Sequence, residues 1–390
     1  MSAVVAAAEQ STVGDEILLL QKKAEDMKEA AGRSAQFSEV ECEAVLSSLY
    51  GCLPLASDAN GIDWSELEEF LEERAHLQPK DWPSTTASAA LLKDIVGTPN
   101  NSETFRKMFE WVLKGGNWHE AKMAAQKRPK DEKPWAVLVM GVNGIRKTTS
   151  VYQEWFTKAL GTALGEEDTS KLPSGHNSFF RQLDYMIATL ANEEFYKLYD
   201  GPLCDEGSDS DGYSKLKDAI FARYRTIAEA LGILLLEAAK EERMNVFVET
   251  SGRDIASFSY MDQFFPDDSQ YKKLVVNFSI DDIKYAEQSV NTRMKKEMAD
   301  GRAAVLRKAT VHELITINAG GPYGSAVLKG IQSESTKVWD QITASSDKDI
   351  RSSVADSWQK VHLSIHGNDL PDQWTVTVTN DAETFSFHRL

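Results

Sequence analysis

Residues 136–149 read AVLVMGVNGIRKTT, and this stretch decides the fold. Its first five residues are apolar and are followed by glycine, which is typical of a buried strand, and a helical pattern starts at Thr148. Glycines let the loop between strand and helix curl so that successive N–H groups face one anion, and the helix N-terminus adds partial positive charge. Lys147 would then reach the β- and γ-phosphates of a nucleotide, and the Thr148 hydroxyl would bind Mg²⁺.

One residue departs from the usual phosphate-loop pattern G-x-x-x-x-G-K-[ST]. Arg146 stands where that pattern has its second glycine, so its side chain either distorts the loop or adds a cation to it. The alternative is an ordinary strand-to-helix turn, and Thr149 could replace Thr148 if the register shifts. With Thr148 as the metal ligand, the predicted cofactor-binding residues are Gly141, Asn143, Gly144, Ile145, Arg146, Lys147, Thr148 and Thr149.

Strands and helices alternate after residue 135, which predicts an α/β class with a parallel sheet flanked by helices. Strands are expected at 136–140, 246–249 and 274–279, with helices at 148–164, 179–199, 213–243 and 282–302. Amphipathic helix dominates before residue 130, and strand-like runs separated by turn residues follow residue 360. We therefore predict a helical N-terminal domain (1–130), an α/β core (131–330) and a small β-rich C-terminal extension with a helix and a β-meander (331–390).

Composition narrows the class of protein. A net charge of −17 over 390 residues argues against a nucleic-acid binder, because an acidic surface repels phosphate backbones. Three cysteines are too few for a disulfide framework or a four-cysteine metal site, which favours a reducing compartment. No stretch approaches the roughly 18 apolar residues of a membrane span, and no secretory signal is evident. We expect a cytoplasmic protein with no membrane or nucleic-acid partner.

Polar side chains at the end of the strand 246–249 are candidates for substrate binding. Glu249, Thr250 and Arg253 emerge at the carboxyl edge of the predicted sheet, where ligands bind in such folds. The alternative is a strand-ending turn in which Asp254 caps a helix.

Two further segments carry charged candidates. Arg181 and Asp184 are three residues apart, so on a helix they share one face and either pair with each other or both face a substrate. The segment 291–302 is the densest basic cluster, and Arg293 and Arg302 could form a cationic lid over a transferring phosphate. A solvated helix face is the alternative for this cluster.

Two weaker motifs remain. Residues 58–66, DANGIDWSE, resemble a calcium-binding loop, but the required acidic positions and the final glutamate are out of register, so a structural helix-loop-helix is the alternative. The glycine-rich residues 318–325 either cradle an anion or turn the chain.

Taken in order, these motifs resemble the zeta-toxin family of P-loop kinases over residues 135–302. GVNGIRKTTSVYQ, FFRQLDYMIATL and VETSGRD also resemble uncharacterised plant and algal P-loop proteins of this type. The resemblance implies a P-loop kinase core, with ATP and Mg²⁺ held by Lys147 and Thr148. It further implies Asp184 as the base for the acceptor hydroxyl, substrate contacts from Glu249 and Thr250, and stabilisation of the phosphate by Arg293 and Arg302.

The resulting hypothesis is an ATP-dependent kinase that phosphorylates a hydroxyl group of a metabolite or nucleotide-sugar. Its predicted catalytic residues are Lys147, Asp184, Arg293 and Arg302, and its predicted substrate-binding residues are Arg181, Glu249, Thr250 and Arg253. The alternative is a non-catalytic nucleotide-binding protein in which Arg146 makes the loop unfit for turnover. In either case the N-terminal helices could recruit a protein partner.

Overall fold

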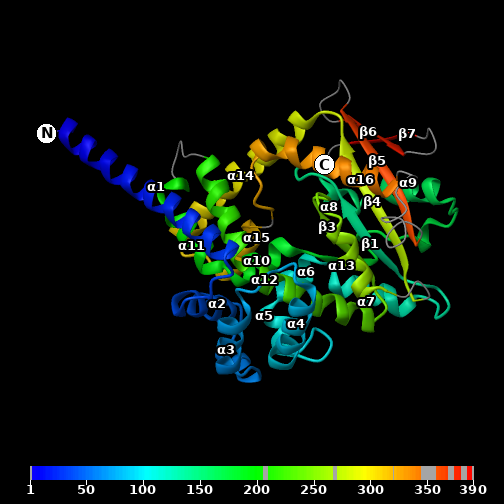
Figure 1. Ribbon diagram of the computed structural model, residues 1–390, viewed down its shortest axis with the longest axis horizontal. Helices are drawn as coiled ribbons and strands as arrows, with labels where there is room; N and C mark the ends of the chain where they lie inside the picture. The colour runs from blue at the N-terminus through cyan, green and yellow to red at the C-terminus, as the bar shows by residue number, and fades with distance from the viewer. Residues whose placement is uncertain are drawn as a thin grey trace. The chain divides into compact units, whose positions relative to one another are not determined.

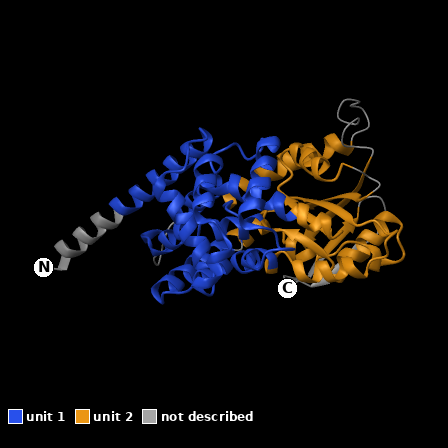
Figure 2. Ribbon diagram, turned by 90° about the horizontal axis from the view of Figure 1, so that it is seen from below, with its two compact units in different colours: residues 1–113, 183–235, 291–324 blue, residues 114–182, 236–290, 325–390 orange. Residues whose placement is uncertain are grey.

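The computed structural model describes residues 2–204, 210–266, 270–318, 320–343, 357–367, 373–378 and 384–388. The chain divides into two compact units, which Figure 2 colours separately. Unit 1 comprises residues 1–113, 183–235 and 291–324, and unit 2 comprises residues 114–182, 236–290 and 325–390. Each unit thus combines segments that are far apart in the sequence. The three contiguous domains 1–130, 131–330 and 331–390 stay a prediction.

A mixed sheet forms the centre of unit 2 (Figure 1). Within the described residues it has seven strands, in the order β2-β3-β1-β4-β5-β6-β7. The first five are parallel, and β6 and β7 are antiparallel at one edge. The strands are β1 (Trp135–Met140), β2 (Ser178–Arg181), β3 (Asn245–Thr250), β4 (Lys272–Ile280), β5 (Trp358–Gly367), β6 (Gln373–Val378) and β7 (Thr384–His388). This arrangement confirms the predicted α/β class, and the predicted C-terminal strands join the same sheet through β5.

Helices cover both faces of this sheet. Side chains alternate between the faces of a strand, so Lys273 and Phe278, five residues apart on β4, lie on opposite faces. The Phe278 face receives α9 (Glu154–Leu164), whose Phe156 ring stacks on Phe278 with a centroid distance of 6.3 Å. The Lys273 face receives α13 (Ala256–Phe264), through an ion pair of 2.8 Å with Asp262, and α16 (Leu328–Thr343).

Strand β1 lies in the interior of the sheet and is fully buried. All six of its residues are buried, as expected for a strand that has parallel neighbours on both sides. Each Val or Leu side chain buried in this way contributes about 1.5–3 kcal/mol. The position of the loop that follows Met140 is therefore fixed by the core.

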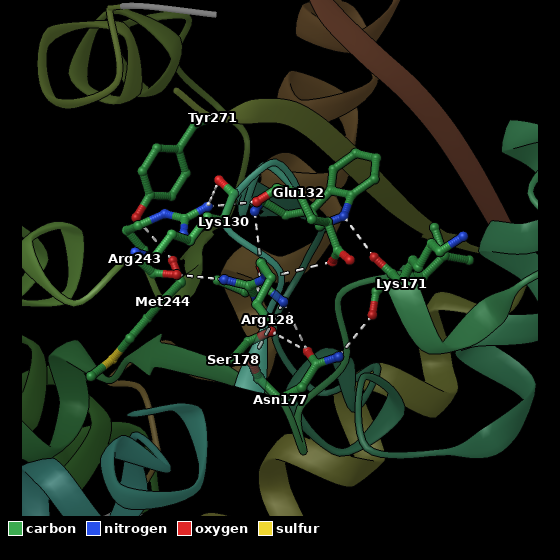
Figure 3. A network of polar contacts seen from close by, with 12 residues as sticks. Arg128, Lys130, Glu132, Lys171, Asn177, Ser178, Arg243, Met244 and Tyr271 are labelled. Atoms are coloured by element: carbon green, nitrogen blue, oxygen red, sulfur yellow. Dashed lines mark hydrogen bonds and ion pairs between the residues drawn. The ribbon is translucent and has the colours of Figure 1, made fainter. Parts of the chain in front are cut away.

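A polar network ties together the ends at which β1, β2 and β3 begin (Figure 3). Asn245 Oδ1 accepts from the Trp135 N–H at 2.9 Å and from Arg128 Nη2 at 2.7 Å, and its amide nitrogen donates to Asn177. Arg243 Nη2 donates to the carbonyl oxygens of residues 130 and 132. Burial lowers the pKa of the Arg128 guanidinium. The network lies at the opposite edge of the sheet from the loop after β1.

Two predicted helices of this region were wrong in part. Residues 179–181, predicted as the start of a helix, belong to strand β2, because Phe179 and Phe180 pair with β3 and bury their rings there. The helix predicted over 148–164 is interrupted after α8 (Lys147–Ser150) and resumes as α9. The Val151 carbonyl accepts from the Gly175 N–H at 2.7 Å, so it is not used to continue the helix.

Unit 1 is helical in its described residues. It contains α2 (Glu39–Gly51), whose N-cap Ser38 forms a capping box with Glu41, and α15 (Val311–Ile317), capped in the same way by Thr310. The unit boundaries fall inside α6 (Glu110–Gly115), α12 (Ser210–Glu241) and α14 (Ile283–Leu306). The remaining helices are α1 (Ser2–Gly32), α3 (Trp64–Arg74), α4 (Trp82–Val96), α5 (Glu103–Met108), α10 (Leu183–Leu190) and α11 (Asn192–Asp200), while α7 (Trp118–Lys127) belongs to unit 2.

Residues 58–66 have structural contacts in this protein. Residues Ala56–Gly61 form a 3₁₀ turn, Asp58 pairs with Lys107 at 2.9 Å, and Asp63 caps α3. No group of three or more His, Cys, Asp or Glu side chains suited to a metal occurs among the described residues.

Two further findings concern the cysteines and the helices. The three cysteines, Cys42, Cys52 and Cys204, are free and buried, and burial raises the pKa of Cys52 to about 12. Among the described residues, no helix has the length and apolar character needed to cross a membrane.

Candidate functional site

The loop after β1 packs its backbone tightly against neighbouring elements of unit 2. Gly141 and Gly144 have positive φ angles of 134° and 86°. A Cβ on Gly141 would lie 2.5 Å from the carbonyl oxygen of Phe278 on β4, and one on Gly144 would lie 2.6 Å from that of Ala286 on α14. Both positions therefore require glycine for space as well as for conformation.

Lys147 folds back over this loop. Its ammonium nitrogen donates to the carbonyl oxygens of Gly141 at 2.7 Å and Val142 at 2.8 Å, and it lies 3.0 Å from Glu249 Oε1. The Lys147 side chain is only 2% exposed. An ammonium group has three donors, so two hold the loop in shape and the third is directed at a carboxylate.

Glu249 also contacts the residue after the lysine. Its second carboxylate oxygen accepts from Thr148 Oγ1 at 2.8 Å. Because β1 and β3 are parallel neighbours, with Val139 opposite Glu249, the end of β3 is held beside the start of the loop. Lys147, Thr148 and Glu249 thus form one cluster, which we call the loop triad, at the carboxyl edge of two parallel strands.

Arg146 takes the backbone conformation that the usual glycine would take. Its φ and ψ of 59° and 35° are in the left-handed region, which costs a non-glycine residue about 1–2 kcal/mol. Its side chain is exposed. The loop therefore keeps its glycine-like turn despite the arginine, and the guanidinium lies at the surface of the loop.

The other loop residues differ in exposure. Ile145 is 3% exposed and packs toward Gly141, whereas Asn143 is half-buried and Thr149 is exposed. The helix α8 that follows has only four residues, so its dipole contributes less to anion binding than that of the expected helix over 148–164. Charge at this site comes mainly from side chains.

The Thr250 and Arg253 side chains belong to the turn after β3. Thr250 Oγ1 accepts from the Gly252 N–H at 3.2 Å and lies 3.2 Å from Ser257 Oγ. Arg253 Nε donates to Ser251 Oγ at 3.2 Å, and Asp254 Oδ1 accepts from the Ala256 N–H at 2.9 Å at the start of α13. The side chains of Thr250 and Arg253 thus make contacts within the turn, whereas the N-cap of α13 is Ile255 and not Asp254.

Arg181 ends strand β2 and is 7% exposed. It is not on a helical face with Asp184, because it belongs to a strand. Its Nη1 donates to Tyr260 Oη at 2.9 Å, and its guanidinium carbon lies 5.0 Å from the centroid of the Tyr260 ring. Arg181 therefore places a buried cation at the end of the edge strand β2, whose neighbour β3 carries Glu249.

Asp184, Arg293 and Arg302 belong to unit 1. Arg293 Nη2 donates to the Gly321 carbonyl at 2.6 Å, and its Nε lies 3.4 Å from Glu297 Oε1. Arg302 Nη1 donates to the Asp200 carbonyl at 2.5 Å and to its carboxylate at 3.2 Å. The negative charge of Asp184 acts to raise the pKa of Lys217, a lysine on α12 whose pKa burial lowers. The catalytic roles of Asp184, Arg293 and Arg302 stay predictions.

The loop triad fits a nucleotide phosphate and a divalent cation. The ammonium of Lys147 lies over the loop and contacts the Glu249 carboxylate. A phosphate oxygen could take the place of that carboxylate. A hydroxyl and a carboxylate are oxygen ligands of the kind that Mg²⁺ prefers, and Thr148 and Glu249 provide them 2.8 Å apart.

Sequence reasoning missed how closely Glu249 is tied to the loop. It assigned Glu249 to the substrate, whereas the structure joins its two carboxylate oxygens to Lys147 and Thr148. The one signal that could have found this is the pairing of the strands that end at Met140 and Thr250, because parallel neighbours end at the same edge. Tyr260, which holds Arg181, carried no signal at all.

Comparisons with known proteins add little to this description. No protein-family model matches the sequence, and no curated protein matches it. Among solved structures, the chain is similar to one from the molecular and structural characterization of the PezAT chromosomal toxin-antitoxin system of the human pathogen Streptococcus pneumoniae. The two are 10% identical with a TM-score of 0.33, over 71% of this chain and 81% of that chain.

Proposed function

We propose that this protein binds ATP with Mg²⁺ at the loop between Gly141 and Thr148 and transfers the γ-phosphate to a hydroxyl group of a small molecule. The observation that carries the proposal is the loop triad. It brings an ammonium, a hydroxyl and a carboxylate together at the end of a buried strand, beside a loop that needs glycine at two positions. Phosphate binding and cation binding need these three groups.

The chain's own residues would divide the work as follows. Lys147 keeps two donors on the loop and offers the third to a phosphate oxygen, while Thr148 and Glu249 provide oxygen ligands for the cation. When bound, ATP supplies the phosphoryl group and Mg²⁺ neutralises its charge. The buried cation Arg181 is the candidate within unit 2 for an anionic part of the acceptor.

Acceptor chemistry rests on the sequence alone. The proposed base is Asp184, and Arg293 and Arg302 are proposed to stabilise the transferring phosphate, as the resemblance to zeta-toxin kinases implies. The proposed acceptor is a metabolite or a nucleotide-sugar. Both arginines would have to exchange present contacts for a phosphate, Arg302 those with Asp200 and Arg293 those with Gly321 and Glu297.

A second candidate is nucleotide binding without transfer. It is favoured by Arg146, which keeps the glycine-like turn under strain and places a cation on the loop surface. In that case the protein would hold nucleotide as a regulatory or scaffold component. Acceptor-dependent release of ADP separates the two functions.

The test is a calorimetric titration of ATP with Mg²⁺ into wild type, Lys147→Met and Lys158→Met. Lys158 lies on α9 with a side chain 63% exposed, so its replacement removes the same charge without touching the loop. We expect binding by wild type and Lys158→Met and at least tenfold weaker binding by Lys147→Met. A screen of hydroxyl compounds for ADP release then identifies the acceptor. Equal affinities of all three proteins would contradict the phosphate-loop assignment.

A further inference from the structure

We propose that helix α1 pairs antiparallel with α1 of a second copy of this chain, through one helix face. The helix spans Ser2–Gly32 and belongs to unit 1 (Figure 1). The face, which we call the dimer face, carries Asp15, Leu18, Leu19 and Lys22. This pairing goes beyond the proposed function and does not depend on it.

Three apolar residues define the side of α1 that contacts its own unit. Ala24 and Met27 are 6% and 9% exposed. Leu20 packs on Gly201, because a Cβ added to that glycine would lie 3.2 Å from Leu20 Cδ1. At about 3.6 residues per turn, these three residues lie on one side of the helix. That side is therefore already used within unit 1.

The opposite side of α1 is exposed. Leu18 and Leu19 are 63% and 67% exposed. Asp15 and Lys22 are exposed as well. All four positions lie within about 60° of the direction opposite to Ala24 around the helix. Two adjacent exposed leucines with a charge at either end form an apolar patch rimmed by polar residues, which is typical of a contact surface.

The dimer face is complementary to itself, and this property identifies its partner. Asp15 and Lys22 have opposite charges, and each lies three residues from the leucine pair, one before it and one after it. In an antiparallel pair centred between Leu18 and Leu19, Asp15 of each copy therefore faces Lys22 of the other. The leucines pack in the middle, Leu18 of one copy against Leu19 of the other. Such an arrangement has twofold symmetry and closes on itself as a dimer.

The charge pattern also selects the antiparallel direction. A parallel pair in register would place Asp15 against Asp15 and Lys22 against Lys22, and like charges across an interface are unfavourable. Because Ala24 is on the side opposite to the dimer face, unit 1 of each copy lies on the outer side of the helix pair. Four leucines and two ion pairs form a small interface, so we expect a reversible dimer with a dissociation constant of about 1–100 µM.

The experiment is sedimentation velocity of the full chain at protein concentrations from about 1 µM to about 200 µM. We expect Asp15→Lys and Lys22→Asp each to weaken association about tenfold, because like charges then face each other twice in the dimer. The two changes shift the net charge of −17 in opposite directions, so net charge cannot account for a loss in both. The double variant restores opposite charges and should return the dissociation constant to within about threefold of wild type.

A matched pair of leucine variants tests the apolar part of the dimer face. Leu306 on α14 is 69% exposed and also belongs to unit 1, so Leu306→Glu is the control for Leu19→Glu. We expect Leu19→Glu to remain monomeric over the whole concentration range and Leu306→Glu to dimerise as wild type does. Circular dichroism and thermal unfolding confirm that each variant is folded.

Three results would overturn the inference. Wild type that stays monomeric throughout would leave the exposed leucines to a partner of another kind. A dimer that all α1 variants leave unchanged would place the interface elsewhere on the chain. Weaker association in both single charge variants, without recovery in the folded double variant, would contradict the antiparallel pairing.

Discussion

The ammonium group of Lys217 on α12 donates to Glu297 Oε2 on α14 at 2.7 Å, and both side chains are buried within unit 1. Lys217 is 0% and Glu297 6% exposed at the side chain. Burial lowers the pKa of Lys217, and the charge of Glu297 opposes that shift. Tyr213 Oη also donates to Glu297 Oε2, at 3.2 Å. The pair is therefore a hydrogen-bonded ionic contact in a buried polar cluster, to which Arg293 and Tyr199 also belong.

We expect Lys217→Met to lower the free energy of unfolding by about 3 kcal/mol, because the buried carboxylate of Glu297 then keeps only Arg293, whose Nε lies 3.4 Å away, as a cationic partner. The double variant Lys217→Met with Glu297→Gln should lose clearly less than the sum of the single variants, since the buried side chain that lost its lysine is then neutral. Lys215→Met is the control on the same helix, at a side chain 64% exposed. Urea denaturation of wild type, Lys217→Met, Glu297→Gln and the double variant measures the coupling, and additive losses would contradict it.

Asn245 is expected to be the most sensitive residue of the polar network that links Arg128, Trp135 and Asn177. Asn245→Ala removes the acceptor of the Trp135 N–H and of Arg128, so a buried backbone donor and a buried guanidinium lose a partner. We expect a loss of about 2–3 kcal/mol in unfolding free energy. Gln359→Ala, at an exposed amide on β5, should change it by less than about 0.5 kcal/mol. Thermal or urea unfolding of both variants checks this difference.

The fold class was predictable because β1, β3 and β4 are short apolar runs whose signals are local. Strand β2 was not, because its phenylalanines precede a helical pattern in FFRQLDYMIATL and the strand exists only through pairing with β3. Pairing between residues 67 positions apart, such as Phe179 and Val246, leaves no mark within either segment. Local periodicity therefore assigned Phe179 to the helix that follows.

The candidate site also combines residues that are close in the sequence with one that only strand pairing brings near. Glycine, lysine and threonine at the loop are adjacent in the sequence, and their predicted proximity needed no tertiary information. Glu249 lies 101 residues beyond Thr148, and the register of β1 and β3 brings the two together. The Lys217–Glu297 pair had no signal, because charged residues on amphipathic helices usually face water. The sequence thus predicted the phosphate-binding chemistry of the loop but not the contact of the loop with Glu249.

His362 on β5 should make stability depend on pH. Its ring nitrogens lie 2.9 Å from Asn277 Nδ2 and 3.1 Å from Ser279 Oγ, and burial lowers its pKa, while Asp340 on α16 opposes that shift. Because the unfolded chain binds this proton more readily, the contribution of His362 is full above about pH 6.5 and is lost as pH falls through its folded pKa.

Urea denaturation at about pH 7.5 and about pH 5.5 tests this expectation. Wild type should lose more stability on acidification than His362→Gln, which cannot titrate there. His119→Gln is the control, because His119 is exposed on α7. An equal loss in wild type and His362→Gln would assign the pH dependence to other groups.

Arg146 combines backbone strain with a side chain that belongs to the predicted nucleotide site, and two substitutions separate these properties. Arg146→Gly relieves the left-handed conformation, at φ 59°, but adds freedom to the unfolded chain, so we expect about 0.5–1 kcal/mol of stabilisation. Arg146→Ala keeps the strain and should not stabilise the protein. Both variants lose the guanidinium, so both should bind ADP with Mg²⁺ severalfold more weakly. Urea denaturation and calorimetry give the two quantities. If only the glycine variant changed nucleotide affinity, loop conformation rather than the arginine cation would control binding.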